Sequence, residues 1–200
     1  MDFPVTALLI AGAAYLLGSV SPAYFAGRAR GVDLRYEGRE TLDFRNAWTV
    51  LGRQVGLLVL IGDALKGQLA IWLAVFLEDS PLALTLAGIA VVAGHIWPIF
   101  HGFAGGAGLA PAAGVLLATS PWTLALSVTL FLLFASLIGR AAQAELLAAA
   151  LIPAVAFLAE RGGIARLGLA IGIACLLVGV RWREVEVLVG ARKGEGEGKE

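Results

Sequence analysis

The chain has 200 residues, of which 59% are hydrophobic and 15% are charged, and its formal net charge at pH 7 is zero. Soluble domains average about 25% charged residues, so this composition and a mean hydropathy of +0.85 exclude an ordinary soluble domain. Zero net charge also gives no basic surface of the kind that nucleic acid requires. The long apolar runs predict an all-α, polytopic membrane bundle, because helices satisfy their own backbone hydrogen bonds in lipid.

About seven helical segments are predicted in chain order, one of them short: 5–27, 55–77, 82–100, 110–119, 122–138, 146–159 and 164–180. The polar stretch 28–53 contains six arginines, which predicts that it is cytoplasmic, that the N-terminus is outside and that the C-terminus is cytoplasmic. Arg140 agrees with this bias, whereas Arg161 and Arg166 oppose it and leave the number of spans open by about one or two. Residues 1–183 are expected to form a single transmembrane domain and 184–200 a solvated tail, whose low-complexity end, 193–200, is expected to be disordered.

Two charged residues, Asp63 and Lys66, lie within the otherwise apolar segment 55–77. Residues three apart share a helix face, so these two are expected to be buried and to compensate each other. Such a pair marks either a functional interior or a structural ion pair between helices. Together with His95, it also leaves open a small transporter or channel.

A glycine-rich turn follows the third predicted span, within GIAVVAGHIWPIFHGFAGGAGLAPAAG from Gly88 to Gly114. Glycines at such a turn can direct backbone N–H groups toward one anion, and the next helix adds its positive dipole end. The stretch is therefore a candidate phosphate site. The alternative is an ordinary tight turn between two helices.

Motifs spread over most of the chain resemble those of the bacterial acyl-phosphate-dependent glycerol-3-phosphate acyltransferases. The matching positions are Gly18-Ser19-Val20-Ser21-Pro22, Val32-Asp33-Leu34-Arg35 with Gly38, Asn46 with Val50-Leu51-Gly52, Gly62-Asp63 with Lys66-Gly67, and Gly94-His95 with Pro98, Phe100, Phe103, Gly105, Gly106 and Gly108. The order and spacing of these positions carry the resemblance.

The resemblance implies transfer of a fatty acyl group from acyl phosphate to the 1-position of glycerol 3-phosphate, giving lysophosphatidate for phospholipid synthesis. It implies neither acyl-CoA, nor a metal, nor another cofactor, and it leaves the oligomeric state open. The partners would be the two substrates and membrane lipid. The implied location is the bacterial inner membrane, with several spans.

The resemblance also implies functional positions. The catalytic candidates are Arg35, Asn46 and His95. The substrate-binding candidates are Arg39, Arg45, Lys66, Gly105, Gly106, Gly108, Arg140 and Arg183.

Several family positions are altered in this chain. Arg39, Glu40, Thr41 and Arg45 stand where the family has serine, glycine, asparagine and threonine, while Ala107 and Val185 replace a lysine and an asparagine. Loss of a charged hydrogen bond to phosphate costs roughly 1.5–3 kcal/mol. The alternative function is therefore a catalytically degenerate relative that acts as a membrane binding or assembly partner.

Overall fold

The computed structural model describes residues 3–159 and 167–197, with side chains described over 5–159 and 167–182. Within these ranges the chain forms nine α-helices, a short 3-10 helix and no strand. The helices are α1 (Phe3–Ser19), α2 (Pro22–Arg28), α3 (Phe44–Leu51), α4 (Arg53–Leu77), α5 (Pro81–Ile96), η1 (Ile99–His101), α6 (Leu109–Thr119), α7 (Pro121–Ile138), α8 (Ala141–Ala159) and α9 (Leu167–Glu197). The all-α membrane bundle is thus confirmed.

Five stretches of the described residues are long and apolar enough to cross a bilayer: Val5–Arg28, Arg53–Leu77, Pro81–His101, Pro121–Ile138 and Ala141–Ala159. Helix α6 and the apolar part of α9, Leu167–Trp182, are shorter. Each of these seven corresponds to one of the segments predicted from hydropathy. Arg161 and Arg166, the two arginines that oppose the charge bias, lie outside the described residues.

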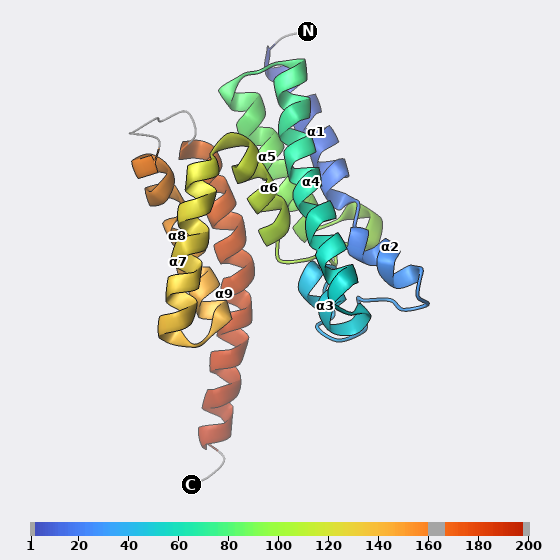
Figure 1. Cartoon of the computed structure of the whole chain (residues 1–200), viewed down its shortest axis with the longest axis vertical. Coiled ribbons are helices and arrows are strands. Elements are labelled where there is room, and N and C mark those ends of the chain that lie inside the picture. The colour runs from blue at the N-terminus through green and yellow to red at the C-terminus, as the bar shows by residue number, and fades with distance from the viewer. Residues whose placement is uncertain (1–2, 160–166, 198–200) are drawn as a thin grey trace.

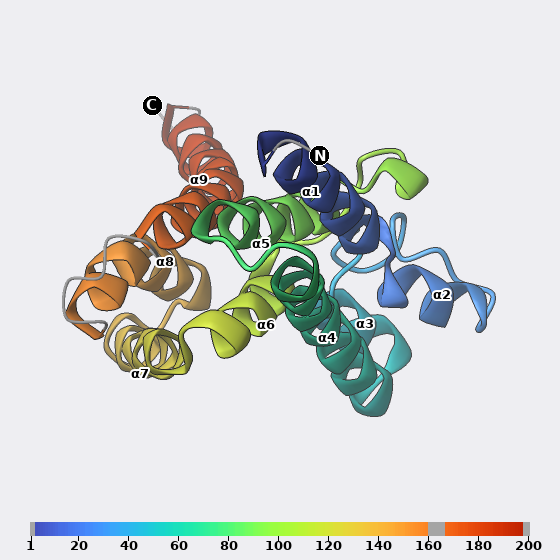
Figure 2. The ribbon, with the colours of Figure 1, turned by 90° about the horizontal axis from the view of Figure 1, so that it is seen from above.

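Helices α5 and α6 occupy the middle of the bundle, with α1 and α4 on one side and α7, α8 and α9 on the other (Figure 2). The main apolar core joins these elements through buried residues such as Ile10, Val91, Val115, Ile152 and Ile173. A second, smaller core that includes Leu34, Leu42 and Val59 lies beneath the polar loop. The glycine-rich turn leads from α5 into α6 and is therefore central in the molecule.

Glycines let the central helices approach their neighbours closely. A Cβ on Gly18 of α1 would overlap the Val91 carbonyl of α5, and a Cβ on Gly94 of α5 would overlap the Tyr15 carbonyl of α1. Gly114 of α6 has the same relation to the Ala64 carbonyl of α4. Small residues at helix contacts are the usual basis of packing in lipid, where the hydrophobic effect does not drive helices together. These contacts fix α4, α5 and α6 around the site.

The structure differs from the sequence prediction in three places. The first span is interrupted after Ser19, because the Ser21 hydroxyl caps a new helix by accepting from Tyr24 N, and Pro22 begins that helix. The polar loop contains α3, whose N-terminus is capped by the Asp43 carboxylate. Finally, the backbone remains helical through Glu197 and so includes the first part of the run 193–200, for which the sequence predicts disorder.

Candidate active site

A cluster of three polar side chains lies where α4, α5 and the break between α1 and α2 meet. Lys66 Nζ is 2.9 Å from Asp63 Oδ1 and 2.9 Å from His95 Nδ1, and all three side chains are buried. The ammonium also donates to the carbonyl oxygens of Gly18 and Val20, at 2.8 and 3.0 Å. The prediction of a buried, mutually compensated Asp63–Lys66 pair is confirmed. Lys66 is fully engaged within the protein, which argues against the substrate contact expected for it.

The cluster fixes the orientation of His95. A charged lysine offers only donors, so His95 Nδ1 accepts from Lys66, and the ring proton is assigned to Nε2 on this basis. A Cβ at Gly106 would lie 2.5 Å from Nε2, so the Nε2–H faces the glycine loop. Asp63 Oδ1 lies 3.3 Å from His95 Nδ1, the ring nitrogen that Lys66 also contacts. His95 can therefore present a hydrogen-bond donor toward the loop.

The glycine loop, residues 105–108, needs glycine because its backbone packs closely against neighbouring atoms. The Gly106 N–H donates to the His95 carbonyl at 3.1 Å, and the Gly105 carbonyl accepts from Leu42 N at 3.1 Å. A Cβ on Gly105 would overlap the His95 carbonyl, and one on Gly106 would lie 2.8 Å from Asp43 Cβ. The expected cradle of N–H groups from all three glycines is therefore wrong, because Gly106 donates inward. Gly108, at φ 82°, instead starts helix α6 and directs its N-terminus to the loop.

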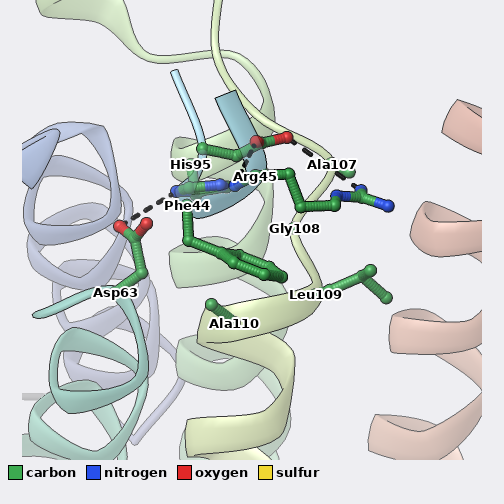
Figure 3. A pocket seen from close by; sticks show the side chains of 9 residues that line it. Phe44, Arg45, Asp63, His95, Ala107, Gly108, Leu109 and Ala110 are labelled. Atoms are coloured by element: carbon green, nitrogen blue, oxygen red, sulfur yellow. Dashed lines mark hydrogen bonds and ion pairs between the residues drawn. The ribbon is translucent and has the colours of Figure 1, made fainter. Parts of the chain in front are cut away.

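A narrow crevice runs between α3, α5 and the start of α6 (Figure 3). Among the residues that line it are Arg45, Asp63, His95, Ala107 and Gly108. The Arg45 guanidinium extends beside Ala107, while His95 points to Asp63 (Figure 3). Arg45 lines the crevice together with Gly108 and Leu109 at the start of α6, so positive charge and the α6 dipole meet at one place.

Arg45 is held by a buried carboxylate from a distant helix. Its Nη1 donates to Glu145 Oε1 of α8 at 2.7 Å, and the other carboxylate oxygen forms an ion pair with Arg181 of α9. Glu145 and Arg181 are both buried. Arg45 Nη2 lies 4.0 Å from Asp43, and its buried Nε has no hydrogen-bond partner among the described residues. Arg45 thus keeps donor capacity that the protein does not use.

A cleft of about 430 Å³ adjoins the crevice. It is lined by Ile96, Trp97 and Phe103 and by α9 residues that include Leu176, Gly179 and Val180. Thr41 and the loop residues Gly105, Gly106 and Ala107 also line it. Ala107 lines both the cleft and the crevice, so it marks their junction. The arrangement can accept a molecule with one anionic end and one apolar end.

Arg35 occupies a separate environment, beyond the residues that line the crevice and the cleft. Its Nε and Nη2 contact the two oxygens of Asp33 at 3.0 and 2.7 Å, and its guanidinium lies 5.4 Å from the Tyr24 ring centroid. The hydrogen bonds from Arg35 lower the pKa of the Asp33 carboxyl from 3.8 to about 2. The carboxylate therefore stays ionised above about pH 2, and it orients Arg35 throughout the physiological range.

The remaining predicted site residues do not converge on the crevice. Asn46 is completely buried, and its amide donates to the carbonyls of Leu34, Glu37 and Thr41 while its oxygen accepts from Arg39 N. These contacts organise the loop, so the position of Asn46 does not support the expected catalytic role. The Arg39 and Arg140 side chains are exposed, and the Arg183 side chain lies outside the described ones.

Sequence reasoning missed Glu145 and Arg181, which complete the arrangement around Arg45. Glu145 could have been identified from the sequence, because it is an acid at the edge of a long apolar run. Its contact with Arg45 could not, because the two residues lie 100 positions apart in the chain.

Comparison with known proteins adds an independent line of support. Residues 8–188 match the family model described as glycerol-3-phosphate acyltransferase. The chain is 36% identical to a glycerol-3-phosphate acyltransferase of Cupriavidus pinatubonensis, covering 96% of this chain and 98% of the relative. It is 35% identical to one of Geotalea daltonii, covering 78% and 80%.

Solved structures agree with this result. PlsY (YgiH), an integral membrane glycerol 3-phosphate acyltransferase, superposes in its glycerol 3-phosphate form with a TM-score of 0.81, at 31% identity and with 93% of each chain covered. Its lysphosphatidic acid form gives a TM-score of 0.80 at 30% identity. The chain belongs to the glycerol-3-phosphate acyltransferase family.

Proposed function

We propose that this protein transfers a fatty acyl group from acyl phosphate to the 1-hydroxyl of glycerol 3-phosphate and releases lysophosphatidate. The observation that carries the proposal is the junction at Ala107, where a crevice containing Arg45 and His95 meets an apolar cleft. Both substrates carry phosphate, and one of them also carries a long apolar chain. Relatives over nearly the whole chain bear the corresponding name.

The reaction requires little covalent chemistry from the protein. The hydroxyl oxygen bonds to the acyl carbonyl carbon, the bond from that carbon to the phosphate oxygen breaks, and the hydroxyl proton ends on the released phosphate. Positioning two charged substrates for this step supplies much of the acceleration. Cations and N–H donors aimed at the developing negative charge supply the rest.

Individual residues can be given roles on this basis. Arg45 and the N-terminus of α6 would hold phosphate at the crevice mouth, and the His95 Nε2–H would donate to an anionic oxygen near Gly106. The acyl chain would lie in the cleft between Trp97 and α9. The crevice itself closes to less than a water molecule, so the anion belongs at its mouth.

The protein is a multi-pass membrane protein, and we further propose that its site faces the cytoplasm of a bacterial cell. Helices α2 and α3, the turn between α7 and α8, and the C-terminal end of α9 lie toward one end of the molecule (Figure 1). The N-terminus and the turn between α4 and α5 lie toward the other end (Figure 1). The arginine-rich loop supports a cytoplasmic position for the first end.

The catalytically degenerate alternative rests on the altered motif positions. It is disfavoured because one of those alterations, Arg45, adds a cation to the crevice rather than removing one. A transporter is disfavoured because Asp63, Lys66 and His95 contact one another and backbone carbonyls.

The deciding experiment uses the purified full chain in lipid vesicles with acyl phosphate and radiolabelled glycerol 3-phosphate. We expect saturable formation of labelled lysophosphatidate that depends on both substrates. Replacement of acyl phosphate by acyl-CoA should give no product. A protein that binds glycerol 3-phosphate without turnover would support the degenerate alternative, and this outcome would refute the proposed activity.

A further inference from the structure

The glycine loop carries no charge of its own at the point where the crevice meets the cleft. Ala107 is buried there, and its methyl group is the side chain that borders both spaces. A phosphate dianion needs a charged donor, since such hydrogen bonds are roughly twice as strong as neutral ones. The charge must therefore come from another element.

Arg45 is the cation among the described residues that line the crevice. It projects from α3, a helix whose start is fixed by the Asp43 cap, and its guanidinium lies beside Ala107 (Figure 3). The contact to Glu145 uses Nη1, which leaves the buried Nε without a hydrogen-bond partner among the described residues. A guanidinium can bind Glu145 and a phosphate together, because its planar fork can contact two acceptors at once.

The closest ion pair of Arg45 is a shared one. Arg45 and Arg181 share the single carboxylate of Glu145, while the Asp43 carboxylate lies farther away, 4.0 Å from Arg45 Nη2. One added lysine at position 107 would supply one positive charge from the loop. The neighbouring cleft of about 430 Å³ has room for the longer side chain.

We propose that Arg45 supplies, from α3, the phosphate-binding cation of the glycine loop, and that positions 45 and 107 are interchangeable sources of this charge. The inference rests on the proposed function and specifies how its phosphate is held. Arg45 contacts substrate directly, whereas Glu145 holds Arg45 in place.

The test compares four full-length proteins in detergent and in vesicles: wild type, Arg45→Ala, Arg45→Ala combined with Ala107→Lys, and the control Arg28→Ala. Arg28 is an exposed arginine of the same polar stretch. Calorimetry measures the Kd for glycerol 3-phosphate, and turnover gives KM. We expect Arg45→Ala to weaken binding by about tenfold or more, the double variant to recover most of this loss, and Arg28→Ala to bind like wild type.

The double variant separates substrate binding from structure. It lacks the Arg45–Glu145 contact as fully as Arg45→Ala does, so any packing defect is common to both proteins. Equal, weak binding by these two variants would overturn the inference, and so would wild-type binding by Arg45→Ala. If the wild type transfers acyl groups while either result holds, only this inference fails. If the wild type neither binds glycerol 3-phosphate nor turns over, the proposed function fails as well.

Discussion

Glu40 has a left-handed backbone conformation, with φ 57°, in the loop that Asn46 organises. A residue with a Cβ costs roughly 1–2 kcal/mol in this region, whereas glycine adopts it freely. We expect Glu40→Gly to stabilise the protein by about 1 kcal/mol, less the larger entropy that glycine has in the unfolded chain. The measurement is the melting temperature in detergent.

The neighbouring Gly38 provides the matched control. It also has positive φ, at 65°, and a Cβ there would lie 2.5 Å from Asn46 Oδ1. Gly38→Ala should therefore lower the melting temperature. A Glu40→Gly protein that melts at or below the wild-type temperature would show that this backbone conformation is not strained.

Single residues differ in how far the sequence alone reveals them. Asp63 and Lys66 could be predicted as a buried pair because charge inside an apolar run must find a partner. The third partner, His95, was visible only as a candidate, since its distance to Lys66 depends on how α5 packs against α4. Gly106 was identified for a wrong reason, because the pattern of glycines does not show which way an N–H points.

At the scale of elements, hydropathy predicts the membrane helices, the short α6 included, but neither α3 nor the break before α2. The break depends on the Ser21 cap and α3 on the Asp43 cap, and hydropathy does not report local capping. Both lie at the site: α3 carries Arg45, and the break before α2 exposes the carbonyls that Lys66 contacts. The elements that hydropathy cannot predict are therefore those that build the functional end of the bundle.

Glu145 joins three helices through its two ion pairs, to Arg45 of α3 and Arg181 of α9. Removing the shared partner leaves buried charge uncompensated, which costs roughly 3–5 kcal/mol when burial is complete. We expect Glu145→Ala to lower the melting temperature markedly. The control is Glu37→Ala, which removes an exposed carboxylate from the polar loop.

The same comparison tests the structural role of the ion pairs. Equal melting temperatures for Glu145→Ala and Glu37→Ala would show that the two arginines are compensated by solvent or by other groups. In that case α8 and α9 would be held to α3 by apolar packing alone.

At the scale of the whole molecule, two different kinds of contact meet at α5 and α6. Toward α1 and α4 the contacts are made by glycines against backbone carbonyls, at Gly94 and Gly114. Toward α8 and α9 the main core uses larger side chains such as Ile152 and Ile173. Close backbone packing fixes the crevice side of the site, while the cleft lies on the side lined by α9.

The orientation of this molecule in the membrane follows from the ends at which its polar segments lie. The α2–α3 loop and the C-terminal end of α9 share one end, and the α4–α5 turn lies at the other (Figure 1). Because the polar stretch 28–53, which includes this loop, contains six of the chain's twelve arginines, we expect it to be cytoplasmic. Cys175 is the single cysteine of the chain, so Cys175→Ala gives a background without thiols.

In that background, Glu37→Cys places a thiol in the loop, and Asp79→Cys places one in the α4–α5 turn. Both positions are exposed. A membrane-impermeant maleimide applied to intact cells should label Cys at position 79 and should reach position 37 only after permeabilisation. Each variant serves as the control for the other, because the two thiols differ in the side of the membrane on which they lie. Labelling of position 37 in intact cells, with protection of position 79, would reverse the orientation and place the Arg45 crevice on the outer side of the membrane.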